Sequence, residues 1–434
     1  ARLASREELE LVRAEEGMQE ANNTYNLQQE NELRVEVAFQ ENATVKLVKG
    51  TAEVFGTEIA IDRPYHLSGC NMAVFTWHGA VIEVTGQYHA YTANETPMVR
   101  YSNVHAVLDA RRRAAAQQGA KAHGPVVVIA GPTDTGKSTL AKILSSYAAR
   151  LDRKPIYVDL DVGQGCITVP GMLAAVPVDR PLDVEEGFQA GAPITFFYGA
   201  TTPSSNKDCY KQQVVALAEH VRGRMDASPI SAHSGVLINT CGWVDGEGFE
   251  LLLHSIRAFK ADVVLVIDHE RLYSDLQSNF RTENVELVKL PKSGGVVTRT
   301  PAFRRRTRTN AVKQYFYGPS GDLCPQNTFI KFADVVIYRI ATGPRAPASA
   351  LPIGFQDTHD PLGLEKMSPS SELVHKVLSV SYSKTEDNIL GANIAGFVVV
   401  KEVDLKRQSM KVLSPCPGPL PGKFLLMGEL TWME

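Results

Sequence analysis

The sequence lacks the features of a secreted, disulfide-stabilised or membrane-spanning protein. Only six cysteines occur among 434 residues, and they are scattered without C-x-x-C pairs, which argues against a disulfide framework or a zinc site. No run reaches the roughly 18 apolar residues that a membrane span needs. The first eight residues are charged and lack the apolar core of a signal peptide. We therefore expect six structural thiols in a reducing compartment, and no membrane partner.

An excess of charge is missing as well. The formal net charge is −3, so no global field attracts nucleic acid, and any such binding must use a local patch. The hydrophobic content of 44% and the charged content of 21% are ordinary for a globular protein. A chain of 434 residues is long enough for roughly three domains, each with its own core.

One stretch predicts a nucleotide site. Residues 126–139 read Val-Val-Val-Ile-Ala-Gly-Pro-Thr-Asp-Thr-Gly-Lys-Ser-Thr, so β-prone residues lead into the phosphate-loop pattern G-x-x-x-x-G-K-[ST]. Lys137 is expected to reach the β- and γ-phosphates of ATP, and the Ser138 hydroxyl to bind Mg²⁺. A glycine turn that binds nothing is the alternative. We expect the loop to hold ATP through eight residues: Gly131, Thr133, Asp134, Thr135, Gly136, Lys137, Ser138 and Thr139.

The hydrophobic pattern divides the chain into four regions. Residues 1–24 are polar. Short alternating runs over 25–103 predict a β-sandwich. Residues 104–318 alternate buried strands with helices, which predicts an α/β domain with a doubly wound, mostly parallel sheet. Residues 319–434 read as a β-rich α+β domain that is interrupted by a Pro-rich loop, 343–369. The predicted strands of the α/β domain are 156–160, 194–198, 236–239, 263–267 and 285–290. Its predicted helices include 212–222 and 249–260.

Two carboxylates follow the second strand of the α/β domain. Asp159 and Asp161 are two residues apart, so both point the same way from an extended chain, beside the phosphate loop at the carboxyl edge of the sheet. One is suited to act on Mg²⁺ or its water shell, for which we name Asp159, and the other to accept a proton from an attacking hydroxyl. Gln164 is placed to orient a nucleophile or a phosphate. The alternative is that both carboxylates only cap the turn.

Further polar and aromatic residues follow other strands. Thr201 and Thr202 offer donors for a phosphate, although an ordinary polar turn explains them nearly as well. Trp243 is placed to stack on a base, or else to pack within its own domain. Residues 292–308 combine a Gly-Gly pair with five arginines, which predicts a hinged lid that brings cations to the γ-phosphate. A basic surface patch or a nuclear-import signal is the alternative. Residues 111–113 are three arginines on an expected helix, 104–118, and indicate a solvated helix face or a nucleic-acid contact.

Together these motifs resemble the eukaryotic polyribonucleotide 5′-hydroxyl kinase family, which includes the cleavage-complex II subunit of pre-mRNA 3′-end processing. The resemblance runs from about residue 25 to the C-terminus. Its motifs are residues 131–139, 159–165, 201–203, 238–243 and 290–297, together with 55–58, 75–79 and 314–318. One departure is Asn26, which stands where the family has an acidic residue on the adenine side.

The resemblance implies ATP-dependent phosphorylation of RNA that carries a 5′-hydroxyl end. It implies a nuclear location, with pre-mRNA cleavage and polyadenylation factors and the tRNA-splicing endonuclease complex as partners. Carried over by position, Asp161 is the base for the 5′-hydroxyl, Trp243 clamps an RNA base, and Arg299 and Arg304 are the lid arginines. Yeast-type members depart in these motifs and look kinase-silent, whereas this chain retains them. The alternatives are an ATP-binding scaffold without turnover, and a regulatory ATPase or another nucleotide-dependent kinase.

Overall fold

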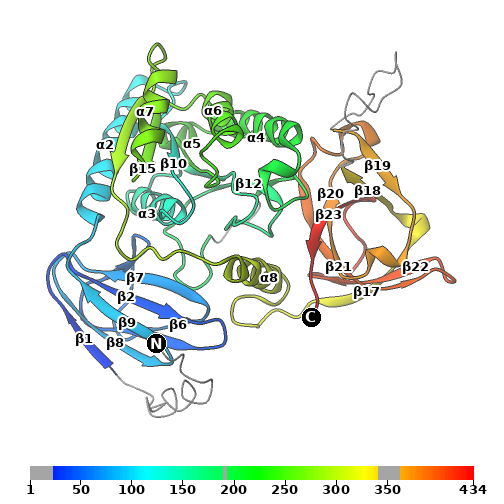
Figure 1. The fold of residues 1–434 in the computed structure, drawn as a ribbon, viewed down its shortest axis with the longest axis horizontal. Helices are drawn as coiled ribbons and strands as arrows, with labels where there is room; N and C mark the ends of the chain where they lie inside the picture. Colours follow the sequence, from blue (N-terminus) through cyan, green and yellow to red (C-terminus); the bar gives the residue numbers. More distant parts are fainter. Residues whose placement is uncertain (1–22, 189–192, 341–361) are drawn as a thin grey trace, which may run out of the picture. The chain divides into compact units, whose positions relative to one another are not determined.

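The computed structural model describes residues 23–188, 193–340 and 362–434, and the chain forms two compact units, residues 1–96 and 97–434 (Figure 1). The predicted polar segment 1–24 lies outside the described residues except for its last two positions. The same holds for most of the predicted Pro-rich loop, 343–369. Within the described ranges, no helix is long and apolar enough to cross a membrane. All six cysteines are free thiols.

The first unit is built from two antiparallel sheets. One has the strand order β1-β8-β3-β6 and the other β5-β4-β7-β2-β9. The alternation seen in the sequence explains the core, because Val45, Leu47, Ile82 and Val84 point inward from β3 and β8 and are all at most 2% exposed. The strands are β1 Asn23–Leu27, β2 Glu32–Val37, β3 Ala43–Gly50, β4 Glu53–Val54, β5 Thr57–Glu58, β6 Pro64–Leu67, β7 Cys70–Phe75, β8 Ala80–Gly86 and β9 His89–Ala93.

The second unit contains the α/β sheet that the sequence predicts. Its strand order is β13-β12-β11-β14-β10-β15-β16. Strands β11, β14, β10, β15 and β16 are parallel, and β12 pairs antiparallel with both β11 and β13. The strands are β10 Val126–Ala130, β11 Ile156–Asp159, β12 Met172–Pro177, β13 Ile194–Phe197, β14 Val236–Asn239, β15 Val263–Ile267 and β16 Glu286–Leu290.

Helices connect these strands. The chain crosses from β10 through α3 to β11 in one direction, and from β14 through α6 to β15 in the other. Right-handed crossovers therefore put α3 and α6 on opposite faces of the sheet. The direction changes between the adjacent strands β10 and β14, and this is where ligands bind in such sheets. The helices are α2 Met98–Gln118, α3 Lys137–Arg150, α4 Lys207–Ala227, α5 Pro229–Ser234, α6 Glu247–Phe259, α7 Glu270–Asn279 and α8 Pro301–Tyr317, with a 3-10 turn η1 at Pro203–Ser205.

A second seven-stranded sheet completes this unit, in the order β17-β22-β21-β20-β23-β18-β19. Its face shares one continuous hydrophobic core with the α/β sheet, in which Phe424 and Trp432 join Phe196 and Phe197. The strands are β17 Gln326–Lys331, β18 Val336–Ile340, β19 Leu364–Met367, β20 Lys376–Ser381, β21 Ile394–Asp404, β22 Ser409–Ser414 and β23 Phe424–Thr431, and the 3-10 turns are η2 Phe332–Asp334, η4 Ser371–Leu373 and η5 Glu386–Asn388.

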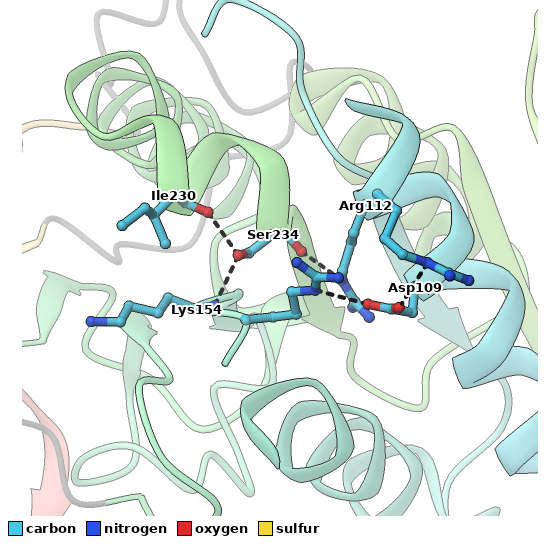
Figure 2. Close-up of polar contacts among 7 residues, drawn as sticks. Asp109, Arg112, Lys154, Ile230 and Ser234 are labelled. Carbon is cyan, nitrogen blue, oxygen red and sulfur yellow. Dashed lines mark hydrogen bonds and ion pairs between the residues drawn. The ribbon is translucent and has the colours of Figure 1, made fainter. Parts of the chain in front are cut away.

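The three arginines of α2 correct one expectation. Arg112 is 1% exposed, so the prediction of a solvated or nucleic-acid-binding face is wrong for this residue. Figure 2 shows its side chain reaching the end of α5, where Nε donates to the Ser234 carbonyl at 2.8 Å. Asp109, one turn earlier, pairs with Arg153 at 2.9 Å and with Arg113 at 3.3 Å. The middle arginine faces inward because successive helical residues are about 100° apart.

Candidate active site

The phosphate loop, residues 131–138, joins the carboxyl end of β10 to α3. Gly136 precedes the helix with a φ of 90°, a conformation that residues with a Cβ rarely adopt. No side chain caps α3, so the first N–H groups of the helix, beginning at Lys137, have no side-chain acceptor. Such N–H groups, together with the helix dipole, form a binding site for anions. The loop therefore fits the phosphates of ATP.

Lys137 lies inside the loop and is 7% exposed. Its Nζ donates to the Pro132 carbonyl at 2.6 Å. Burial lowers the pKa of Lys137, and the nearby Asp161 carboxylate opposes that shift. Lys137 and Asp161, which the sequence predicts to act in one reaction, are thus within electrostatic range of each other.

Asp159 ends β11 and is 2% exposed. Its Oδ1 accepts hydrogen bonds from Asn239 Nδ2 at 3.0 Å and from the Asp161 N–H at 3.1 Å. Its Oδ2 accepts from the Cys166 N–H at 2.9 Å and from the thiol of that residue at 3.3 Å. Burial raises the pKa of Asp159, and these donors oppose the shift. The carboxylate therefore caps the turn, as one of the two sequence interpretations proposed.

Asp161 lies beyond the end of the strand, so the expected shared face of an extended chain does not apply. Its Oδ1 accepts from the N–H groups of Gly163 and Gln164, both at 3.0 Å. Burial and the like charge of Asp159 raise the pKa of Asp161 to about 6, whereas Lys137 lowers it. A carboxylate with this pKa is a base poised near neutral pH. Asp161 therefore caps the turn, and its role as a base stays a prediction.

The loop after β13 packs on the turn that holds Asp161. A Cβ added at Gly163 would lie 2.7 Å from the Thr201 carbonyl oxygen, so only glycine allows this approach. Thr202 is exposed, and its hydroxyl forms a hydrogen bond with Ser204 Oγ at 2.9 Å. Gln164 has a buried Nε2 with no partner among the described residues. Thr201 and Gln164 are thereby brought to Asp161, while Thr202 faces outward.

The loop after β14 touches the phosphate loop directly. A Cβ added at Gly242 would lie 2.5 Å from both the backbone nitrogen and the Cγ2 of Thr133. The next residue, Trp243, is half-buried, and its ring packs so closely on Gly248 that a Cβ there would lie 2.4 Å from it. The indole thus packs within its own unit at the carboxyl edge of the sheet. Its stacking on an RNA base stays a prediction.

The segment predicted to be a lid is partly helical. Arg299 lies on the segment after β16, but Arg304 and the three arginines that follow it are on helix α8. Arg304 Nη2 forms an ion pair with Asp134 Oδ2 at 2.7 Å, and the Arg299 N–H donates to the same oxygen at 3.0 Å. Both arginines therefore meet the phosphate loop.

The sequence interpretation missed two residues of this site. Asn239 supports Asp159, and its only sequence signal is a polar residue that ends an apolar strand. Cys241 lies within electrostatic range of Asp161 and Lys137, and burial followed by the Asp161 charge raises its pKa to about 11. The Cys241 thiol is therefore neutral near pH 7.

The residues of the site also fit a magnesium ion that has few ligands from the protein. Among residues 23–188, 193–340 and 362–434, no cluster of three or more His, Cys, Asp or Glu side chains is arranged to hold a metal. Magnesium is usually bound by one or two protein groups, water and substrate phosphates. The Ser138 hydroxyl at the start of α3 fits that pattern as a direct ligand. The oxygens of Asp159, which already accept several hydrogen bonds, fit an interaction through water.

Comparisons with known protein families cover almost the whole described chain. Residues 26–115 match the family model for the N-terminal beta-sandwich domain of polyadenylation factor. Residues 131–318 match the model for the mRNA cleavage and polyadenylation factor CLP1 P-loop. Residues 323–434 match the model for pre-mRNA cleavage complex II protein Clp1.

Individual relatives agree with these matches. The chain is 46% identical over 405 residues to the "Protein CLP1 homolog" of Dictyostelium discoideum, which covers 93% of this chain and 88% of the relative. It is 42% identical over 413 residues to the "Polyribonucleotide 5'-hydroxyl-kinase Clp1" of Homo sapiens, covering 94% and 96%. A solved Clp1p, in a complex with a Pcf11p fragment, has the same fold, with a TM-score of 0.83 at 22% identity over 96% of this chain and 99% of that one. The chain belongs to the Clp1 family.

Proposed function

We propose that this protein is an ATP-dependent kinase that transfers the γ-phosphate of ATP to the 5′-hydroxyl end of RNA. The observation that carries the proposal is the position of Asp161. This carboxylate has its pKa raised to about 6 and lies within electrostatic range of Lys137 in the phosphate loop. This supports a site that combines a phosphoryl donor with a base for an attacking hydroxyl. The human relative is named for this activity.

The reaction assigns a role to each residue. Asp161 accepts the proton of the 5′-hydroxyl, the hydroxyl oxygen bonds to the γ-phosphorus, and the bond to the β–γ bridging oxygen breaks, so that ADP leaves. Lys137, Arg299 and Arg304 stabilise the negative charge that redistributes over the phosphate oxygens. Ser138 would hold Mg²⁺ directly and Asp159 would act through its water shell, and the ion would supply further charge neutralisation on the phosphates.

The RNA is expected to meet the loops beside Asp161. Trp243 is proposed to contact a base, and Gln164, Thr201 and Thr202 to contact the phosphate or the terminal nucleotide. We propose a nuclear location and assembly with pre-mRNA cleavage and polyadenylation factors and the tRNA-splicing endonuclease complex. The family models name the cleavage complex, and the solved Clp1p is bound to a fragment of Pcf11p.

A transfer assay tests the proposal. The full chain is incubated with Mg²⁺, γ-labelled ATP and one RNA oligonucleotide that carries either a 5′-hydroxyl or a 5′-phosphate. Label should appear only on the 5′-hydroxyl RNA, and Lys137→Ala should reduce it by about 100-fold or more. Equal rates for Lys137→Ala and wild type would remove Lys137 from the mechanism. Phosphate release into water without any RNA would instead indicate an ATPase.

An ATP-binding scaffold is the second candidate. The observation in its favour is the C-terminal sheet, whose edge strand β17 presents Phe329 with 73% of its surface exposed. Large exposed apolar residues mark interaction surfaces when they are grouped, and edge strands offer unpaired backbone groups. ATP binding with no label on either RNA in the same assay would support the scaffold over the kinase.

A further inference from the structure

The side chain of Asp134, in the phosphate loop, contacts Arg299 and Arg304. Asp134 has a left-handed φ of 56°, and 13% of its side chain is exposed. Its Oδ2 accepts the Arg299 N–H at 3.0 Å and Arg304 Nη2 at 2.7 Å. We call residues 292–308 the arginine-bearing segment. One Asp134 oxygen therefore binds this segment twice, once before α8 and once in the first turn of α8.

A third contact joins the same two segments. A Cβ added at Gly136 would lie 3.3 Å from Val296 Cγ2, so the start of the arginine-bearing segment packs over the glycine that precedes α3. Val296 is itself in a turn, since its N–H donates to the Ser293 carbonyl at 3.2 Å. The segment is thus in contact with the phosphate loop before and after Arg299.

The far half of α8 has a separate anchor. The buried residues of the helix are Val312 and Phe316, and both belong to the core shared with the C-terminal sheet. Tyr315 OH accepts the Phe397 N–H at 3.1 Å. The apolar burial of α8 therefore lies in its C-terminal half, whereas its N-terminal half meets the phosphate loop through the charged pair of Arg304 and Asp134.

We propose that Asp134 is a positioning residue that docks the arginine-bearing segment on the phosphate loop. Its carboxylate sets where Arg304 and Arg299 stand, while the backbone N–H groups of the loop serve the phosphates. The charges of Asp134 and Arg304 act in opposite directions on the pKa of Lys137, which places the docked pair at the nucleotide end of the site. The catalytic consequence rests on the proposed kinase function, but the docking itself does not.

The test uses Asp134→Asn in the full chain. Asparagine has the same size, tolerates the left-handed conformation and still accepts the Arg299 N–H, but it loses the charge that pairs with Arg304. Asp152→Asn is the matched control, because Asp152 also has a left-handed φ of 57° and is exposed at the opposite end of α3. Trypsin cleavage after the arginines of residues 299–308, without ATP, reports docking independently of any reaction.

The cleavage rate and kcat are expected to change together, whereas the melting temperature and the Kd of ATP stay nearly constant. Cleavage of this segment should be several-fold faster in Asp134→Asn, with an unchanged melting temperature. The kcat for RNA should fall by about 10- to 100-fold because a displaced catalytic arginine loses its alignment. The Kd of ATP should change by less than about twofold, because the substitution affects the reaction and not the binding of ATP. In an Arg304→Gln background, Asp134→Asn should add little to the loss of kcat, since the two residues act as one pair.

The outcomes separate the two proposals. If Asp134→Asn weakens ATP binding as much as it lowers kcat, or acts equally with and without Arg304, Asp134 contacts the nucleotide directly and the docking role is overturned. Unchanged cleavage and unchanged kcat would also overturn it. If wild type transfers no phosphate but Asp134→Asn still accelerates cleavage relative to Asp152→Asn, docking stands and the kinase assignment fails.

Discussion

Asp159 and Asn239 are register partners on neighbouring strands, and the Asn239 amide donates to Asp159 Oδ1 at 3.0 Å. This hydrogen bond crosses from β11 to β14 at the carboxyl edge of the sheet. Burial raises the pKa of Asp159, and the hydrogen bond from Asn239 opposes that rise. The charge of Asp159 is then one reason why the pKa of Asp161 is raised, after burial itself.

The pH dependence of RNA phosphorylation should follow Asp161. The base must be ionised, so kcat/KM for 5′-hydroxyl RNA is expected to fall as the pH drops below about 6. Asp159→Asn removes the like charge and should move this acidic limb to lower pH, whatever it does to the maximal rate. The measurement is kcat/KM between pH 5 and 8, about the range in which such groups titrate. An acidic limb at the same pH in both proteins would show that Asp159 does not act on the base.

Asp161 should also reduce the stability of the protein at neutral pH. Its folded-state pKa of about 6 lies above the ordinary value of 3.8. The folded state therefore binds the proton more tightly, and the stability that the protonated carboxyl provides is lost as the pH rises through about 6. Asp161→Asn keeps an acceptor for Gly163 and Gln164 and should raise the free energy of unfolding by about 3 kcal/mol at pH 7.5.

This gain should shrink at lower pH, where the wild-type carboxyl is itself protonated. Urea unfolding of both proteins at pH 7.5 and pH 5 measures the difference. A gain of equal size at both pH values would assign it to packing and not to the buried charge.

The contact between Gly242 and Thr133 predicts that even a methyl group disrupts the nucleotide site. In Gly242→Ala the new Cβ would lie 2.5 Å from a backbone nitrogen of the phosphate loop, so one of the two loops must move. We expect ATP affinity to fall by about tenfold or more, as misplacement of about 1 Å in such sites does to rates. Titration with a fluorescent ATP analogue measures this.

Gly223→Ala is the control for that substitution. Gly223 is within α4, and a Cβ there meets nothing within 4 Å. It should leave ATP affinity unchanged and stabilise the protein by about 0.5–1 kcal/mol through helix propensity. If Gly242→Ala binds ATP as well as Gly223→Ala does, the phosphate loop tolerates the displacement and the contact has no functional weight.

Arg112 should matter for stability and not for catalysis. Arg112→Met keeps most of the side-chain volume but removes the donor to the buried Ser234 carbonyl. Asp109 retains Arg113 and Arg153, so no unpaired charge is left behind. A loss of about 1–3 kcal/mol in the free energy of unfolding is expected. Arg113→Met, with 63% of the arginine side chain exposed, should cost about 0–1 kcal/mol. Equal losses for the two variants would contradict the structural role of Arg112.

The buried parallel strands were predictable because their sequences are unbroken apolar runs. Strands β14 and β15 begin and end at the predicted residues. Strand β12, Met172–Pro177, escaped prediction, since alanine and methionine have weak strand preference. Strand β23 escaped in the same way, because its Phe-Leu-Leu-Met run also suits a helix.

The site was predictable in its parts but not in its connections. The phosphate loop, Asp161 and the arginines each have a local signature. The ion pair between Asp134 and Arg304 joins residues 170 apart in the chain, and no spacing rule links them. The burial of Arg112 also depends on α5, which packs against α2 from far along the sequence. Local patterns predict which residues do chemistry, whereas tertiary packing decides which neighbours hold them in place.

The hydrophobic core shared by the α/β sheet and the C-terminal sheet has a consequence for how the protein melts. The core runs from Phe196 and Phe197 to Phe424 and Trp432, and α8 contributes Phe316 to it. Residues 97–434 should therefore denature in a single cooperative transition. A fragment that ends at Gly318 would leave this apolar surface exposed and should aggregate. The family models mark separate segments of sequence, and two of those segments are expected to unfold as one unit.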